Sequence, residues 1–113
     1  MPLLLELLSY FAEPNGPPTN VTVIGVTNLS LTISWDLPRP EDQNGVIRQY
    51  TVYYWKQSRP MTNKVLNFSQ LDHEGTISGL SPYTNYTIKV SASTSAGEGV
   101  QSKKVTYQTA EAG

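Results

Sequence analysis

The sequence predicts an all-β fold, a sandwich of seven short strands, and two observations support this prediction. First, apolar and polar residues alternate along several segments, as expected for strands that bury one face. In the clearest segment, Tyr86, Ile88, Val90 and Ala92 share one face, and Thr87, Lys89, Ser91 and Ser93 share the other. Second, turn-forming residues recur about every ten residues, and no helix of useful length is predicted after residue 18. Short strands separated by regular turns are typical of a β-sandwich.

The first thirteen residues form an apolar segment that we place outside the predicted sandwich. Its apolar run is shorter than the roughly 20 residues that span a bilayer, and Glu6 interrupts it. It also lacks the basic start of a secretory leader, and Tyr10 stands where a leader ending at Ala12 would have a small residue. Three interpretations stay open: a degenerate leader, a remnant of an upstream segment, or a helix that docks elsewhere.

A proline- and glycine-rich linker is predicted next, over residues 14–18, because helices and central strands do not tolerate that density of Pro and Gly. The domain itself is predicted over residues 19–109. Its first strand covers residues 21–26, and a turn at Thr27 and Asn28 leads into a second strand over residues 29–35. The inward residues of this second strand are expected to be Leu29, Leu31, Ile33 and Trp35.

Residues 36–45 are polar and interrupted by prolines, so we expect a long loop there. The third strand is predicted over residues 47–56, with Tyr50, Val52 and Tyr54 facing inward. Two short strands near residues 65–69 and 75–78 precede the alternating segment that contains Tyr86. A last strand is expected over residues 100–109, followed by a small, polar C-terminal linker over residues 110–113.

Three local patterns resemble those of the fibronectin type III family. They are Trp35 on the second strand, Tyr50-Thr-Val52-Tyr-Tyr54 on the third, and Leu80-Ser-Pro82-Tyr-Thr84-Asn-Tyr86 before the sixth. The resemblance covers about residues 17–109 and implies a seven-stranded immunoglobulin-like sandwich. Within the family, two segments look like those of modules in receptor-type tyrosine phosphatase, sidekick-like and usherin-like ectodomains. They are Asn-Gly-Val-Ile-Arg-Gln-Tyr over residues 44–50 and Ser-Ala-Ser-Thr-Ser-Ala-Gly-Glu-Gly over residues 91–99.

The resemblance also implies structural roles for individual residues. Tyr86 matches the tyrosine corner, whose ring is buried while its hydroxyl bonds an upstream backbone group. Trp35 would fill the centre of the core. The residues expected to form the core are Trp35, Tyr50, Val52, Tyr54, Leu80, Tyr86, Ile88 and Val90.

Composition argues against several classes of partner and site. Charged residues are 15% of the chain and the net charge is −1, which argues against a nucleic-acid surface or a polybasic membrane patch. The absence of cysteine excludes thiolate metal sites and cysteine nucleophiles. Four N-x-[ST] sequons outweigh the cytosolic setting that a lack of disulfides would favour. These glycosylation candidates, Asn20, Asn28, Asn67 and Asn85, predict an extracellular or cell-surface location.

The sequence offers no convincing catalytic or cofactor site. His73 is the sole histidine, and its acidic neighbours Asp72 and Glu74 would point to the opposite face of an extended chain. A solvated loop is therefore the favoured interpretation. Gly97-Glu98-Gly99 is too short to cradle a phosphate and is expected to form a tight turn. A calcium site built from Asp36, Glu41 and Asp42 would lack enough oxygen ligands. We expect no enzyme activity, no cofactor and no bound metal.

The candidate contact patch consists of Tyr53, Trp55 and Lys89, which are expected on the outer face of neighbouring strands. An ordinary cross-strand cation–π contact would account for the same residues. We interpret the chain as a non-catalytic spacer or adhesion module of a larger receptor or adhesion protein. Expected partners are neighbouring modules and cell-surface protein ligands, without nucleic acid or a small-molecule substrate, and with membrane contact only through the parent protein. The alternative is a ligand-binding module of a cytokine-receptor-like protein, which would carry paired cysteines and a Trp-Ser-x-Trp-Ser motif; this chain has neither.

Overall fold

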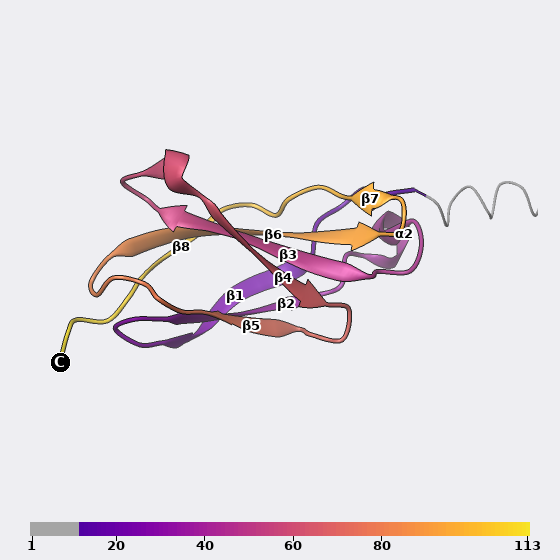
Figure 1. Cartoon of the computed structure of the whole chain (residues 1–113). Coiled ribbons are helices and arrows are strands. Elements are labelled where there is room, and N and C mark those ends of the chain that lie inside the picture. Colours follow the sequence, from indigo (N-terminus) through magenta and orange to yellow (C-terminus); the bar gives the residue numbers. More distant parts are fainter. Residues whose placement is uncertain (1–11) are drawn as a thin grey trace, which may run out of the picture.

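The computed structural model of the chain describes residues 12–113, and it has the sandwich architecture that the sequence predicts. Predictions for residues 1–11 fall outside the described residues. Figure 1 shows two layers of antiparallel strands packed face to face. One layer is a sheet of order β1-β2-β5, formed by Thr19–Val26, Leu31–Asp36 and Glu74–Ile77. The other has the order β4-β3-β6-β7, with β8 also paired to β6.

The second sheet holds the longest strand, β6, which pairs with β3 over eight residue positions, from Gln49↔Ser93 to Lys56↔Tyr86. Its strands are β3 (Gln49–Lys56), β4 (Lys64–Ser69), β6 (Asn85–Thr94), β7 (Gly97–Glu98) and β8 (Val105–Gln108). Two short helical turns interrupt the loops, α2 (Pro40–Gln43) and the 3-10 turn η1 (Pro60–Thr62). The all-β prediction is confirmed.

The core lies between the two sheets, around Trp35. Its indole ring packs against the rings of Tyr50 and Phe68, with centroids 5.5 and 5.4 Å away. Of the eight predicted core residues, seven are buried and Tyr54 is partly buried against them. The remaining buried apolar residues are Leu31, Ile33, Ile47, Ile77 and Ala92.

Phe68 reaches the core because Gly75 leaves space for it. A methyl group on Gly75 would lie 2.3 Å from the Phe68 ring, well inside van der Waals contact. These two residues sit on β4 and β5, the edge strands of opposite sheets. The ring therefore closes one side of the sandwich. Sequence patterning alone did not single out this pairing, because it depends on the packing of one sheet on the other.

Several predicted strand boundaries are wrong. The first strand begins at Thr19 rather than at residue 21, the third begins at Gln49 rather than at residue 47, and residues 97–98 form β7, with the expected tight turn at residues 95–96 instead. At two further boundaries a local hydrogen bond competes with the ladder. Leu29 was expected inside the second strand, facing inward, but β2 begins at Leu31 and Leu29 is 49% exposed. Residues 27–30 form a turn instead, in which the Thr27 amide donates to the Ser30 carbonyl at 3.0 Å.

At the other end of the chain, β8 begins at Val105 rather than at residue 100. Before it, the Val90 amide donates to the Ser102 hydroxyl at 2.9 Å instead of to a backbone carbonyl. Regular pairing with β6 therefore begins only at Val105.

The proline-rich segment before β1 is packed on the sandwich rather than held apart from it. Pro14, Gly16 and Pro18 are buried. The Asn15 amide donates to the Asp42 carbonyl at 2.7 Å. Gly99 allows the close approach, since a methyl group there would lie 2.6 Å from the Pro14 carbonyl oxygen. Composition identified a non-helical segment but gave no sign of the loops on which it rests.

Candidate functional site

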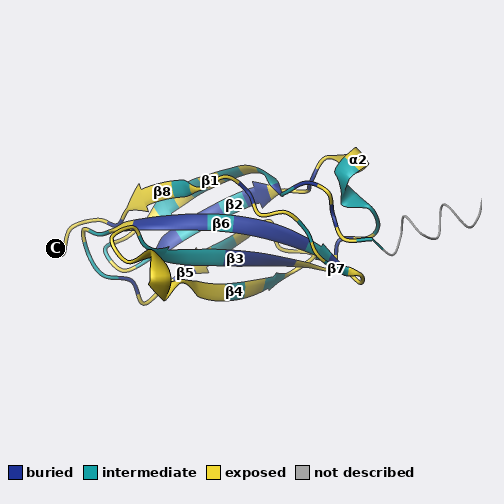
Figure 2. Ribbon diagram, turned by 90° about the horizontal axis from the view of Figure 1, so that it is seen from above, coloured by how far each residue is buried: buried dark blue, intermediate teal, exposed yellow. Residues whose placement is uncertain are grey.

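The outer face of β3 and β6 carries the candidate contact patch. Tyr53 lies directly opposite Lys89 in the β3–β6 register, and Trp55 lies opposite Thr87. All three patch residues are of intermediate exposure. Figure 2 shows β6 buried along most of its length, whereas β4 at the sheet edge is mainly exposed.

Hydrogen bonds to Glu98 on β7 hold part of this patch in place. The Tyr53 hydroxyl donates to the Glu98 carboxylate at 2.5 Å, and the Ser91 hydroxyl donates to the same oxygen. Burial, reinforced by the hydrogen bond and negative charge of Glu98, raises the pKa of Tyr53 to about 12. The expected cation–π contact with Lys89 is not among the aromatic contacts of residues 12–113. Tyr53 is thus a hydrogen-bonded component of the sheet surface.

The sequon asparagines are distributed over both sheets. Asn20 is on β1, Asn67 on β4 and Asn85 at the start of β6, and all three are exposed, whereas Asn28 is half-buried in the turn after β1. The Asn20 amide nitrogen donates to Asp36 at 2.7 Å. The Asn67 side-chain oxygen accepts from Thr51 at 3.0 Å and from Gln49 at 3.2 Å.

The tyrosine-corner prediction is confirmed. The Ser81 amide donates to the Tyr86 hydroxyl at 2.9 Å across five residues of sequence, and Tyr86 is only 4% exposed. This bond fixes the loop that crosses from one sheet to the other. Both residues also line a hollow described below.

The acidic residues considered for calcium are engaged by other side chains. Asp42 accepts from the Arg39 guanidinium at 3.1 Å, with Glu41 at 3.8 Å from it. The neighbouring carboxylates raise the pKa of that guanidinium, with the Asp42 hydrogen bond as the main cause. Asp36 accepts from Asn20. Residues 12–113 contain no group of three or more His, Cys, Asp or Glu side chains arranged to hold a metal ion.

His73 lies in the turn before β5, with an exposed side chain. Its carbonyl oxygen accepts from the Trp35 amide at 2.9 Å. Its ring lies 6.0 Å from that of Tyr50, centroid to centroid. The backbone of His73 therefore supports the strand that carries Trp35, while its imidazole contributes only an edge contact.

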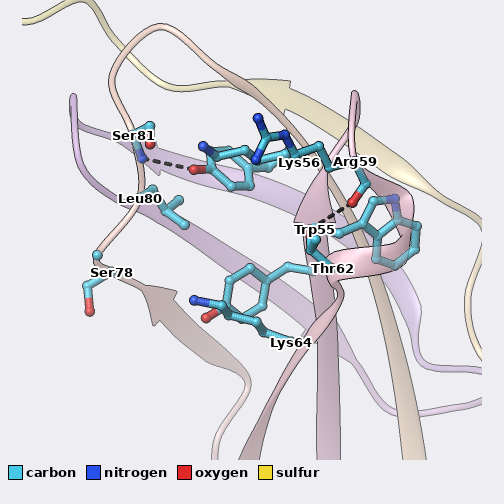
Figure 3. Close-up of a pocket in the computed structure, with 11 residues that line it drawn as sticks. Trp55, Lys56, Arg59, Thr62, Lys64, Ser78, Leu80 and Ser81 are labelled. Carbon is cyan, nitrogen blue, oxygen red and sulfur yellow. Dashed lines mark hydrogen bonds between the residues drawn. The ribbon is translucent and has the colours of Figure 1, made fainter.

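A hollow of about 410 Å³ opens at the end of the sandwich where the chain leaves it (Figure 3). It lies between the end of β3, the following loop with η1, the start of β4, and the loop between β5 and β6. Sequence analysis did not identify this hollow. Its lining residues are Tyr54, Trp55, Lys56, Arg59, Thr62, Lys64, Ser78, Gly79, Leu80, Ser81 and Tyr86.

Among the described residues, no helix combines the length and apolar character that crossing a bilayer requires.

Solved structures share this architecture. The solution structure of the third fibronectin III domain of human KIAA0343 protein superposes with a TM-score of 0.78 and 30% sequence identity, covering 88% of this chain and 86% of that one. The crystal structure of the FN1–FN3 domains of chicken CNTN1 gives a TM-score of 0.77 at 25% identity, covering 88% of this chain and 33% of that one.

Curated proteins match in sequence as well. Phosphatidylinositol phosphatase PTPRQ of Rattus norvegicus is 37% identical over 96% of this chain, and protein sidekick-2 of Gallus gallus is 33% identical over 89%. Receptor-type tyrosine-protein phosphatase F of Mus musculus is 39% identical over 80%. The chain spans only 4 to 5% of the length of these relatives. The profile of the fibronectin type III domain matches residues 16–108, and the chain therefore belongs to the fibronectin type III family.

Proposed function

We propose that the chain acts as a non-catalytic, extracellular spacer and protein-contact module of a larger cell-surface receptor or adhesion protein. The small share of each relative that it covers supports a modular role, and one of those relatives is named as a receptor. In that setting the fold contributes spacing and orientation, and any catalysis belongs to other parts of the protein.

The observation that carries this proposal is how the chain enters and leaves the sandwich. The two segments emerge at opposite ends of the module (Figure 1). On entry, the Ala12 carbonyl accepts from Thr94 at 2.7 Å and the Glu13 carbonyl accepts from Asn44 at 3.0 Å. These contacts come from the end of β6 and from the loop after α2, so they fix the direction of entry.

The exit is fixed in the same way. The Ala110 amide donates to the Thr27 carbonyl at 3.0 Å, and the Tyr83 amide donates to the Ala110 carbonyl at 3.0 Å. Thr109 is 2% exposed, and its hydroxyl donates to the Ser81 carbonyl at 2.6 Å. A module anchored at both ends transmits a fixed distance and direction, which is what a spacer requires.

The extracellular location rests on the sequons, three of which are exposed. Expression of the chain through a secretory pathway should add mass that an N-glycan-removing amidase takes away. Asn20, Asn28 and Asn67 are the favoured acceptors, since Asn85 directly precedes the buried Tyr86. Secretion without a mass shift at any sequon would contradict this location.

The spacer role is tested in the full-length protein by changing Tyr53 and Trp55 to Ser together. Cell aggregation should be unchanged, because both side chains are partly covered and Tyr53 is bonded within the sheet. Changing Ile24 and Val26 to Ser is the matched control, since these exposed apolar residues lie on the other sheet. Aggregation lost only in the Tyr53/Trp55 variant, at an unchanged melting temperature, would show that the patch is adhesive.

A further inference from the structure

The hollow at the exit end of the module carries a concentrated positive charge. Lys56, Arg59 and Lys64 line it, and its lining includes no Asp or Glu. Within residues 12–113 the ion pairs are those of Arg39 with Glu41 and Asp42, so none of the three cations is neutralised by a neighbour. Like charges held close together without a counter-charge favour an anionic partner.

The geometry is suited to a partner that enters between the cations. In Figure 3, Lys56 and Arg59 lie on one side of the hollow and Lys64 on the other, with Leu80 on the loop that faces them. Arg59 and Lys64 are exposed and Lys56 is of intermediate exposure, so the charged groups are accessible. Leu80 is 7% exposed and gives the hollow an apolar wall, while Ser78 and Thr62 supply hydroxyl groups.

The opposite end of the same module shows the complementary chemistry. The turn between β4 and β5 carries Asp72 and leads to Glu74, the first residue of β5. Leu71, next to Asp72, is 82% exposed. Such a loop presents carboxylates beside an apolar side chain, which matches cations beside an apolar wall. Glu41 on α2 and Glu98 on β7 lie at the same end (Figure 1), but Glu41 pairs with Arg39, and Glu98 accepts hydrogen bonds from Tyr53 and Ser91, so the acidic character of this end rests on the turn between β4 and β5.

We propose that the hollow lined by Lys56, Arg59 and Lys64 is a binding site for an acidic loop of a protein partner, with an apolar residue next to its carboxylates. The carboxylates would pair with the cations while the apolar side chain contacts the wall at Leu80. This site goes beyond the spacer role, which does not depend on it. A peptide is favoured over a purely anionic polymer because the lining combines charge with an apolar surface.

The test is a titration of the whole isotope-labelled chain with a capped peptide that repeats residues 69–75, Ser-Gln-Leu-Asp-His-Glu-Gly. At low ionic strength, amide NMR shifts should change for residues 54–64 and 78–81. The double variant Lys56→Gln/Lys64→Gln should weaken binding by about fivefold or more, as expected for the loss of two ion pairs. A peptide with Asn and Gln in place of Asp and Glu should not bind.

The matched control is Lys103→Gln/Lys104→Gln, which removes the same charge from two exposed residues outside the hollow. It should weaken peptide binding by less than about twofold. Melting temperatures verify folding, and Arg59→Gln replaces the double variant if the latter unfolds. Equal weakening by both lysine pairs, or no shift at the hollow, would overturn the proposal. Tighter binding of a heparin tetrasaccharide than of the peptide, through the same residues, would assign the site to a sulfated polysaccharide and also overturn it.

Discussion

Both faces of β6 contain buried residues, but different interactions bury them. On the inner face, Ile88, Val90 and Ala92 are fully buried among apolar side chains of the other sheet. On the outer face, Thr87 and Ser91 are 4% and 0% exposed, although no second sheet covers them. Hydroxyl contacts to neighbouring strands cover them instead, through Thr106 and Glu98. Equal burial therefore reflects apolar packing on one face and satisfied polar groups on the other.

This difference has an energetic consequence. A substitution that shortens a side chain on the inner face lowers the free energy of unfolding in proportion to the cavity it leaves, because the surrounding core relaxes only partly. The Tyr53–Glu98 hydrogen bond on the outer face contributes less, because both side chains are at least partly exposed and water can replace a missing partner. Variants of the two faces should therefore differ in size of effect and in pH dependence.

The largest effect is expected for Trp35→Ala on the inner side. Trp35 is 1% exposed and contacts Tyr50 and Phe68, so its removal leaves a large cavity. We expect a loss of about 3–5 kcal/mol in the free energy of unfolding, measured by urea denaturation. His73→Ala is the control at the edge of the same aromatic cluster and should cost less than about 0.5 kcal/mol. A larger loss for His73→Ala would contradict its assignment to the surface.

An intermediate effect is expected for Tyr86→Phe, which keeps the buried ring and removes a single hydroxyl. The Ser81 amide would lose its partner at the junction between the sheets. The expected loss is about 1–3 kcal/mol, because a partly buried donor is left unsatisfied. Denaturation of this variant beside Tyr54→Phe, another tyrosine of the same hollow, separates the corner hydrogen bond from a general effect of losing a hydroxyl. Equal losses would refute a special role for the corner.

The smallest effect, and the one that depends on pH, is expected for Tyr53→Phe on the outer face. At neutral pH the loss of the bond to Glu98 should cost less than about 1 kcal/mol. The native pKa of about 12 lies above the ordinary value of about 10 that we take for the unfolded chain. The unfolded state therefore releases this proton first, and the associated stability is complete below about pH 10 and is lost as the pH rises toward 12.

Melting curves of the wild type and Tyr53→Phe between pH 8 and 12 measure this contribution, since other tyrosines and lysines titrate equally in both. The wild type should lose stability more steeply than the variant above about pH 10. Parallel curves would mean that folding does not raise the pKa of Tyr53. Hydrogen bonding on the outer face would then make no measurable pH-dependent contribution to stability.

The sequence by itself determined the all-β class, most residues of the inner face and, through the family resemblance, the tyrosine corner. Alternation along one strand depends only on covalent neighbours, so it identified Ile88 and Val90 as core residues without knowledge of their partners. The resemblance of residues 80–86 to the family pattern likewise implied the tyrosine corner, in which the Tyr86 hydroxyl accepts from the Ser81 amide only five residues away.

Only the tertiary structure decided what covers the outer face, where the chain enters, and which side chains surround the hollow. The Tyr53–Glu98 bond joins residues 45 positions apart, and the Ala12–Thr94 bond joins residues 82 apart. The hollow brings together Lys56 on β3 and Leu80 on the loop between β5 and β6. Such contacts follow from strand register and from the packing of one sheet on the other, and alternation along a single strand carries no information about either.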